Sequence, residues 1–486
     1  MGQRRPNVVF VVMDTARVAN ATDPHVMPNL NAIAEAGARV TNAFATAPWT
    51  LPSHASMFTG QYTAEHGTDA DTKSFDPAVP TLAARLQTTG YQTVAVSNNT
   101  WVSPEFGFDD GFEEFLVGWE LLAGGTDLAS ISKSETGFVD RTRAVLGELR
   151  AEGGHRTLVN ALYTRFLRRA YDDGAWMTNY RIGRWLEQQR EPDRPFFLFV
   201  NYLEPHLQYD PPRRFRERFV SEERATDVNQ DAWAYVTGLT DMSDREFETL
   251  EALYEAELNY LDHRIGRLYD RLNHHELLED TVLVLVGDHG ENIGDHGLMD
   301  HQYSLHDSLL HVPLVMHYPE RIDAGTTVSD LVELRDLYPT ILDLAGVATP
   351  TAETVSTTGI LSDGASRERV IAEYLTPQPS MEALERTLGT LPASARRYDR
   401  ALRSIRTDEW KLIEASDGKH ELYRIDEDPD ETIDLAAERE DVRDRLCERL
   451  YEERGPRSFE GESKSETNTS MAAATRERLD DLGYLQ

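Results

Sequence analysis

The sequence VVFVVMD, residues 8–14, is an apolar run that ends in an aspartate, and VLVLVGDHGE, residues 282–291, is a second such run. Each has the length of one buried strand and leads into residue types that bind metals. Strands that are apolar throughout belong to parallel sheets covered on both faces, and such sheets bind ligands at their carboxyl edge. The two runs therefore predict an α/β fold that brings Asp14, Asp288 and His289 to one edge of a sheet.

A helix start lies between these runs, in TLPSHASMFTG at residues 50–60. Pro52 suits the first turn of a helix, residues 53–58 suit its body, and Gly60 suits its end. Thr50 is then placed at a helix N-terminus, where unpaired backbone N–H groups favour an anion. A hydroxyl there can attack phosphorus or sulfur if a metal lowers its pKa. Taken alone, the same pattern more often describes a threonine that caps an ordinary helix.

Helical and strand patterns alternate along most of the chain. A helical pattern with a glycine stop covers residues 27–37, and another covers 81–89 before a strand pattern at 91–99. This order predicts a mostly parallel central sheet flanked by helices. Further patterns predict strands at 195–204 and 312–317 and helices at 177–189, 243–276 and 335–345, with Pro313 indicating an edge or the start of its strand.

The pattern changes after a loop or linker at residues 347–367. Short strands at 403–406, 410–413 and 421–424, with turns between them, predict a small antiparallel sheet. We therefore divide the chain into a catalytic domain at 1–350 with a variable helical insert at 101–185, a small C-terminal α+β subdomain at 368–455, and a mobile tail with a short terminal helix at 456–486.

The charge of the chain is strongly acidic. Its 486 residues include 84 acidic and 49 basic ones, a formal net charge of −35. This charge argues against nucleic acid as a partner, because phosphate repels it. It is typical of proteins that work in high salt, so we expect a halophilic source. The single cysteine, Cys447, excludes an intrachain disulfide.

The sequence also bears on location and partners. Residues 1–6 lead directly into the first strand and leave no room for a signal peptide, and no apolar run is long enough to span a bilayer, so we expect a cytoplasmic protein. Residues 156–171 form a basic amphipathic pattern. It predicts either a surface helix packed on the core or a contact with an anionic lipid or substrate, including a peripheral membrane contact. Nothing in the sequence indicates an oligomeric state.

Together these motifs resemble the sulfatase family of the alkaline phosphatase superfamily, over nearly the whole chain. The matching stretches, in order, are 6–14, 50–53 with 59–60, 204–206, 287–291, 295–298, 337–340, and 410–413 with 421–423. The resemblance implies an alkaline phosphatase-like fold with a C-terminal subdomain. It also implies that Asp14, Asp288 and His289 hold a divalent metal, and that Thr50 both binds the metal and attacks the substrate.

Three positions depart from the working sulfatases. Those enzymes convert a cysteine or serine at position 50 to formylglycine, and Thr50 cannot form that aldehyde because its β-carbon carries a methyl group. His54 replaces an arginine of the family, and Asp14-Thr15 replaces a pair of aspartates. We therefore expect no formylglycine, and the departures favour phosphoryl over sulfuryl chemistry.

The resemblance assigns roles to other polar residues. His54 and His206 are candidate catalytic groups, and His206 can protonate the leaving oxygen. His301 occupies the place of a family lysine and is either a contact for the substrate or, with His206, a ligand for a second metal. Asn98 and Arg17 are candidate contacts for the anion. Carboxylate and imidazole ligands suit manganese or zinc at least as well as magnesium or calcium. The number of ions, one or two, stays open.

The sequence thus predicts a metal-dependent ester hydrolase. It cleaves a phosphate monoester or diester, as a phosphodiesterase does, or a sulfate ester, through a covalent intermediate on Thr50. Two alternatives stay open: a phosphoryl transferase, and a catalytically weak, anion-binding member of the same fold. The small anionic ester is the only partner that the motifs indicate.

Overall fold

A computed structural model describes residues 5–120, 172–350, 356, 359–361, 367–455, 475–476 and 478–479. The predicted amphipathic helix at 156–171, most of the predicted insert at 101–185, and almost all of the predicted tail at 456–486 lie outside these residues. Among the described residues no helix is long and apolar enough to cross a membrane.

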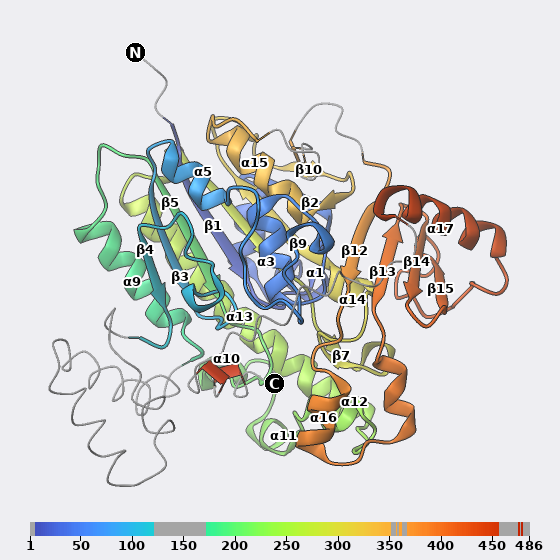
Figure 1. Cartoon of the computed structure of the whole chain (residues 1–486). Coiled ribbons are helices and arrows are strands. Elements are labelled where there is room, and N and C mark those ends of the chain that lie inside the picture. Colours follow the sequence, from blue (N-terminus) through green and yellow to red (C-terminus); the bar gives the residue numbers. More distant parts are fainter. Residues whose placement is uncertain are drawn as a thin grey trace, which may run out of the picture.

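A nine-stranded sheet forms the centre of the molecule (Figure 1), in the order β10-β2-β9-β6-β1-β5-β3-β4, with β11 paired to β2. Eight of the nine strands run in one direction, and only β9 runs against them, so the predicted α/β class with a mostly parallel central sheet is confirmed. The strands are β1 (Asn7–Met13), β2 (Ala38–Phe44), β3 (Gln92–Ser97), β4 (Glu114–Val117), β5 (Phe196–Tyr202), β6 (Thr281–Gly287), β9 (His311–His317), β10 (Thr326–Val328) and β11 (Val332–Glu333).

The first strand, β1, lies in the middle of this sheet. It pairs in parallel with β5 on one side and β6 on the other, and Met13 lies opposite both Tyr202 and Gly287. All seven residues of β1 are buried, because helices cover both faces. The register brings the residues that follow β1, β5 and β6 to one edge, where Asp14 N–H donates to Tyr202 O at 3.1 Å.

The position of strand β9 in the sheet differs from the prediction. It runs antiparallel between β2 and β6, so it is an interior strand and not an edge strand. Pro313, the third residue of β9, takes part in neither ladder register, because it has no N–H to donate.

The helices fall into two groups around the sheet (Figure 1). One group consists of α3 (Thr50–Thr59), α5 (Leu82–Thr88) and α15 (Leu337–Leu344), which contact one another. In the other group, the long helix α13 (Asp244–His274) contacts α2 (Pro28–Ala36), α9 (Ala175–Gln188) and α10 (Arg213–Arg216). Shorter helices are α1 (Val18–Ala21), α4 (Thr63–His66), α11 (Glu222–Asp227), α12 (Ala232–Val236) and α14 (Asp307–Leu310). A two-stranded hairpin, β7 (Asn292–Ile293) and β8 (Met299–Asp300), follows β6.

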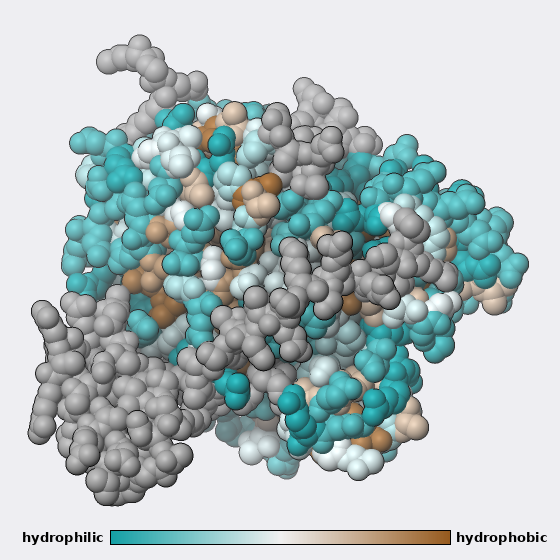
Figure 2. All heavy atoms as spheres, viewed as in Figure 1, coloured by the Kyte–Doolittle hydropathy of each residue, from teal (hydrophilic) through white to brown (hydrophobic). Residues whose placement is uncertain are grey.

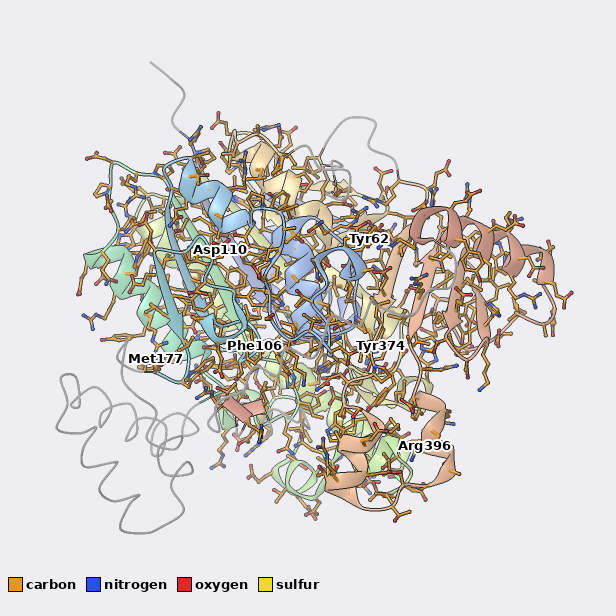
Figure 3. The ribbon with its side chains drawn as sticks, in the orientation of Figure 1. Tyr62, Phe106, Asp110, Met177, Tyr374 and Arg396 are labelled. Atoms are coloured by element: carbon orange, nitrogen blue, oxygen red, sulfur yellow. The ribbon has the colours of Figure 1, made fainter. Side chains whose placement is uncertain are left out.

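The C-terminal part contains a four-stranded antiparallel sheet, as predicted. Its strands are β12 (Val370–Tyr374), β13 (Leu402–Arg406), β14 (Trp410–Ala415) and β15 (His420–Arg424), and α17 (Glu440–Arg454) contacts β13 and β14. The sequence patterns did not identify β12. Between β12 and β13 the chain leaves this sheet through α16 (Met381–Leu388), and Tyr398 then stacks on Tyr303 with ring centroids 5.4 Å apart. Figure 3 shows this departure, with Tyr374 beside the C-terminal sheet and Arg396 well away from it. The proposed domain boundaries remain a prediction.

Hydrophilic side chains cover much of the described surface in the view of Figure 2, above all around the C-terminal sheet. A surface of this kind agrees with the net charge of −35. The halophilic source stays a prediction.

Candidate active site

Thr50 is the first residue of α3. Trp49 precedes it in an extended conformation, and Gly60 ends the helix with a left-handed φ of 73°, as the sequence predicted. The Thr50 side chain is completely buried, and its Oγ1 lies 3.3 Å from Nε2 of His289. The hydroxyl therefore faces the residues that follow β6.

Asp14, Asp288 and His289 lie together, as the sequence predicted. One ligand atom of each residue lies within 4.8 Å of the others, and all three side chains are completely buried. Nε2 of His289 lies 3.4 Å from Asp288 Oδ2 and 3.8 Å from Asp14 Oδ1. Thr15 adopts a left-handed φ of 56°, unusual for a β-branched residue, and its N–H donates to Asp288 Oδ1 at 3.1 Å.

The tautomer of His289 suits metal binding. Its Nδ1 lies 2.9 Å from the carbonyl oxygen of Gly290, so Nδ1 carries the donated proton and Nε2 is left as the basic nitrogen toward Thr50. Burial lowers the pKa of His289 well below its usual value, which keeps the imidazole neutral.

The two carboxylates carry charge that the described residues do not neutralise. Burial raises the pKa of Asp14 to about 7, and burial together with the charge of Asp14 raises that of Asp288 well above its usual value. Asp14 Oδ1 and Asp288 Oδ2 are buried and accept no hydrogen bond from the described part of the chain. Two such oxygens beside a basic imidazole nitrogen fit a divalent cation, which would pair with both charges.

His54, a predicted catalytic group, lies one helical turn after Thr50. Its Nδ1 lies 2.9 Å from the carbonyl oxygen of Thr50 and 3.5 Å from Asp288 Oδ2, and Asn201 Nδ2 lies 3.4 Å from its Nε2. Burial lowers the pKa of His54 to about 4. His54 therefore lies at the base of the site, where it supports α3 against the end of β5.

Asn99, and not Asn98, contacts Thr50. Asn99 Nδ2 donates to Asp14 Oδ2 at 2.6 Å and lies 3.4 Å from Thr50 Oγ1. The side chain of Asn98 instead accepts a hydrogen bond from Thr178 on α9 at 3.2 Å. The sequence analysis predicted an amide at the end of this strand, but it named Asn98 and not the neighbouring Asn99.

His206 and His301 lie side by side, with ring centroids 5.1 Å apart. His206 follows β5, and its Nδ1 lies 2.6 Å from the carbonyl oxygen of Leu207. His301 follows β8, and its ring centroid lies 4.6 Å from that of His289. Both predicted residues therefore border the group formed by Asp14, Asp288 and His289.

Arg17 does not reach this group. Its guanidinium forms two hydrogen bonds of 3.1 Å with Asp295, and it lines a separate cavity of about 820 Å³ together with His306 and Tyr423. The contact of Arg17 with an anion stays a prediction.

Four buried residues of the site were missed by the sequence reasoning: Asn99, Asn201, Glu291 and Asp300. Glu291 had a signal, because it follows Asp288 by three positions in the same run. The other three have no distinctive spacing, and only the sheet register and the β7–β8 hairpin bring them to the site.

Comparison with known proteins identifies the class. The central sheet and the C-terminal sheet form a fold that is shared with a solved structure covering 96% of this chain, with a TM-score of 0.67 and 19% identity. The Sulfatase family model matches residues 6–347, and the chain belongs to the sulfatase family. Members of this family typically bind a divalent metal, which agrees with the ligand types at Asp14, Asp288 and His289.

Individual relatives are distant but cover most of the chain. A choline-sulfatase of Rhizobium meliloti (strain 1021) is 25% identical over 89% of this chain and 82% of its own length. Arylsulfatase K of Homo sapiens is 26% identical over 92% of this chain and 82% of its own. A phosphonate monoester hydrolase of Agrobacterium radiobacter has a similar fold, with a TM-score of 0.65, 20% identity, and coverage of 93% of this chain and 95% of its own.

Proposed function

We propose that the protein hydrolyses phosphate esters through a covalent intermediate on Thr50. The observation that carries the proposal is the position of Thr50 Oγ1, at the first residue of α3 and 3.3 Å from the basic nitrogen of His289. A buried hydroxyl between a helix N-terminus and a group of metal ligands has the surroundings of a nucleophile toward an anionic centre.

The residues of this chain define the two steps. In the first, Thr50 Oγ1 bonds to phosphorus, and the bond from phosphorus to the alcohol oxygen breaks. The alcohol oxygen takes up a proton in exchange for the one that the Thr50 hydroxyl loses, and His206 is the group proposed to relay it. Burial lowers the pKa of His206 to about 4 and its Nδ1 faces Leu207 O, so Nε2 is the nitrogen that can take up a proton and pass it on. In the second, water attacks the phosphorus, the bond to Thr50 Oγ1 breaks, and phosphate or a phosphate monoester is released.

Other residues position these atoms. The amide of Asn99 donates to Asp14 and faces Thr50 Oγ1, so it holds the carboxylate and the hydroxyl in one arrangement. Asp14, Asp288 and His289 would hold the divalent cation. When bound, that cation polarises the ester and lowers the pKa of the Thr50 hydroxyl.

Threonine at position 50 is the reason to place phosphate before sulfate. Its side chain cannot become formylglycine, and a direct hydroxyl nucleophile suits phosphoryl transfer. Sulfate esters remain the second candidate, since the choline-sulfatase and arylsulfatase K named above are the relatives whose sequences cover most of the chain. Transfer of the phosphoryl group to a second alcohol follows the same first step and differs only in the acceptor.

An activity panel tests the proposal. Wild type and Thr50→Ala are assayed in high-salt buffer with Mn²⁺ or with chelator, on an aryl phosphate, a bis-aryl phosphodiester and an aryl sulfate. Thr63→Ala is the matched control, because Thr63 is also a buried threonine that begins a helix, α4. We expect metal-dependent phosphoester turnover that falls about 10³-fold or more in Thr50→Ala and is unchanged in the control.

A second readout identifies the nucleophile. Acid quenching during turnover of the phosphodiester should leave a phosphorylated peptide that contains Thr50, found by mass spectrometry. Sulfate turnover that survives in Thr50→Ala would overturn the assignment of the nucleophile. Products formed with an added alcohol separate transfer from hydrolysis.

A further inference from the structure

A second group of metal-ligand side chains lies beside the first. One ligand atom each of Glu291, Asp300 and His301 lies within 4.8 Å of the others. The exposed fractions of these residues are 0%, 4% and 1%. The β7–β8 hairpin brings them together, because Asn292, next to Glu291, pairs with Asp300. The three residues thus converge through local structure that directly follows Asp288 and His289.

Glu291 has no partner that accounts for its burial. Both of its carboxylate oxygens are buried and accept no hydrogen bond from the described residues. Nδ1 of His301 lies 3.7 Å from Oε1, beyond hydrogen-bond distance, and lies 2.5 Å from Asp300 Oδ1 instead. A completely buried carboxylate in this state has a large desolvation penalty unless a cation faces it.

The charges of the two groups do not balance. Asp14 and Asp288 belong to the first group, and Glu291 and Asp300 to the second; none of the four forms an ion pair with a lysine or arginine among the described residues. One divalent cation at the first group matches only the first two carboxylates. The second pair would then face, at most, one charged imidazole, His301.

We infer that Glu291, Asp300 and His301 bind a second divalent cation, so that the site holds two. The inference rests on the proposed function only for the presence of the first cation. The rings of His289 and His301, one from each group, have centroids 4.6 Å apart, so the two groups of ligands are adjacent. His206, 5.1 Å from His301, borders the same place.

The ligand types indicate the kind of cation. Two carboxylates with one imidazole suit Mn²⁺ or Zn²⁺ better than Mg²⁺, which prefers oxygen ligands and water. A cation held by these three residues would add a second positive charge next to the group formed by Asp14, Asp288 and His289. This arrangement favours phosphate over a substrate that carries less charge.

Metal counting tests the inference without any assay of activity. The full chain is stripped with chelator and equilibrated with Mn²⁺ by dialysis, and bound manganese is measured by elemental analysis. We expect two ions per chain in wild type and one in Glu291→Gln, in His301→Gln and in Asp14→Asn. Glu257→Gln is the matched control: Glu257 is a buried glutamate, but its Oε1 accepts a hydrogen bond from Asp210 N–H at 3.0 Å, and two ions are expected there.

Electron paramagnetic resonance of the manganese-loaded wild type is the second measurement. Two adjacent Mn²⁺ ions give the broadened spectrum of a coupled pair, which should revert to that of an isolated ion in Glu291→Gln. If Glu291→Gln loses both ions, the wild-type spectrum decides: a coupled pair supports the inference and an isolated ion overturns it.

Two results overturn the second site: one ion per chain in saturated wild type, or two ions in both Glu291→Gln and His301→Gln. If wild type binds one ion per chain but its turnover depends on Thr50, the second site is wrong and the proposed function still holds. If wild type binds two ions per chain but turns over no phosphoester, the second site is supported and the proposed function is wrong.

Discussion

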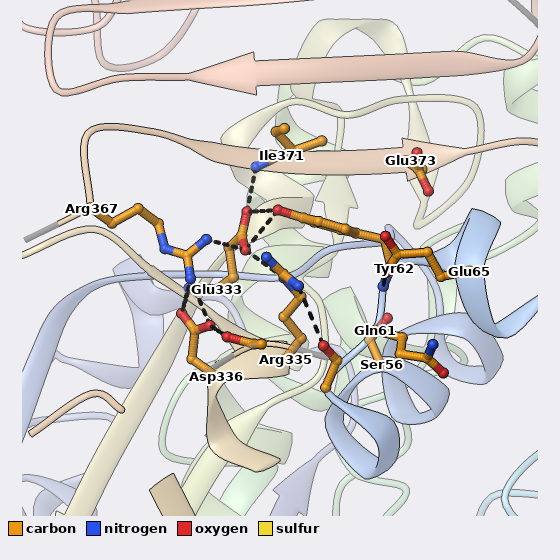
Figure 4. Close-up of polar contacts among 12 residues, drawn as sticks. Ser56, Gln61, Tyr62, Glu65, Glu333, Arg335, Asp336, Arg367, Ile371 and Glu373 are labelled. Carbon is orange, nitrogen blue, oxygen red and sulfur yellow. Dashed lines mark hydrogen bonds and ion pairs between the residues drawn. The ribbon is translucent and has the colours of Figure 1, made fainter. Parts of the chain in front are cut away.

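Two of the buried groups of carboxylates among the described residues are built in opposite ways. One is the site at the edge of the central sheet. The other joins the end of α3 to the C-terminal sheet, and its charged residues are Glu333, Asp336, Arg335 and Arg367 (Figure 4). We refer to these four residues, with the hydroxyl of Tyr62, as the arginine network.

The arginine network neutralises itself. Two guanidiniums face two carboxylates: Arg335 Nε donates to Glu333 at 2.7 Å, and Arg367 donates to both oxygens of Asp336 at 2.7 and 2.9 Å. Burial acts to raise the pKa of Glu333, but the charges of Arg335 and Arg367 outweigh it and lower that pKa. The network connects parts of the chain without any ligand.

No lysine or arginine of the described part of the chain pairs with a carboxylate of the edge site. Burial raises the pKa values of Asp14 and Glu291 to about 7, and their partners are histidines. The comparison teaches that burial alone does not separate structure from function in this protein. Between these two groups, the difference is that the carboxylates of the arginine network have guanidinium partners and those of the edge site have histidines.

The largest effect is expected from a carboxylate of the edge site. Asp288→Asn should lower phosphoester turnover by more than about 10³-fold, because it removes a metal ligand beside Thr50. The free energy of unfolding of the metal-free protein should stay equal or rise, because a buried charge without a guanidinium partner is removed. Asp270→Asn, an exposed change with 70% side-chain exposure at Asp270, is the control for both measurements. A metal-free Asp288→Asn protein that unfolds more easily would contradict the comparison.

The arginine network should respond in the opposite sense. Glu333→Gln should lower the free energy of unfolding by about 3–5 kcal/mol, since it leaves Arg335 and Arg367 without their shared carboxylate. Turnover per folded molecule should be unchanged. Urea unfolding measures the first quantity, and Glu382→Gln, an exposed change on α16, is the control. A loss below about 1 kcal/mol would show that the network contributes no more than a surface pair.

Added cation should stabilise the edge site but not the network. Mn²⁺ at about a hundredfold its dissociation constant should raise the free energy of unfolding of the stripped wild type by about 3 kcal/mol for each bound ion. Asp14→Asn should lose part of this gain, while Asp343→Asn, 66% exposed at its side chain, should keep all of it. Equal gains in wild type and Asp14→Asn would mean that the cation binds elsewhere.

A buried neutral histidine provides the smallest test. Burial lowers the pKa of His66 to about 3, so its stabilisation is fully present above pH 6.5 and is lost as the pH falls toward 3. Between pH 7 and 4.5, His66→Gln should lose about 2 kcal/mol less free energy of unfolding than wild type. The exposed change His25→Gln should lose as much as wild type, and an unchanged loss in His66→Gln would contradict the pKa shift.

The sequence predicted the parts of the site that depend on continuous runs. The apolar strands fixed the edge at which Asp14, Asp288 and His289 meet, and Pro52 with Gly60 fixed the helix of Thr50. Asn99 was missed in favour of Asn98 because successive side chains at a strand end point in different directions, and the sequence does not define where the strand leaves its pleat.

The remaining differences come from contacts distant in sequence. The sequence does not show that Arg17 pairs with Asp295, because the two residues lie 278 positions apart. The interior position of β9 depends on β2 and β6, and β12 was missed because its pairing with β13 lies across the α16 segment. Local patterns carry no information on such pairs.

The central position of β1 has a consequence for how the protein folds during its synthesis on the ribosome. Thr15, at the end of β1, donates to Asp288, which lies 273 positions away. Strand β1 therefore lacks its neighbour β6 until residues 281–287 have been synthesised. Parallel pairs of strands so far apart in the sequence form slowly. Asp14 and Asp288 can therefore come together only after more than half of the chain has been made, so a cation held by both would be acquired late in folding.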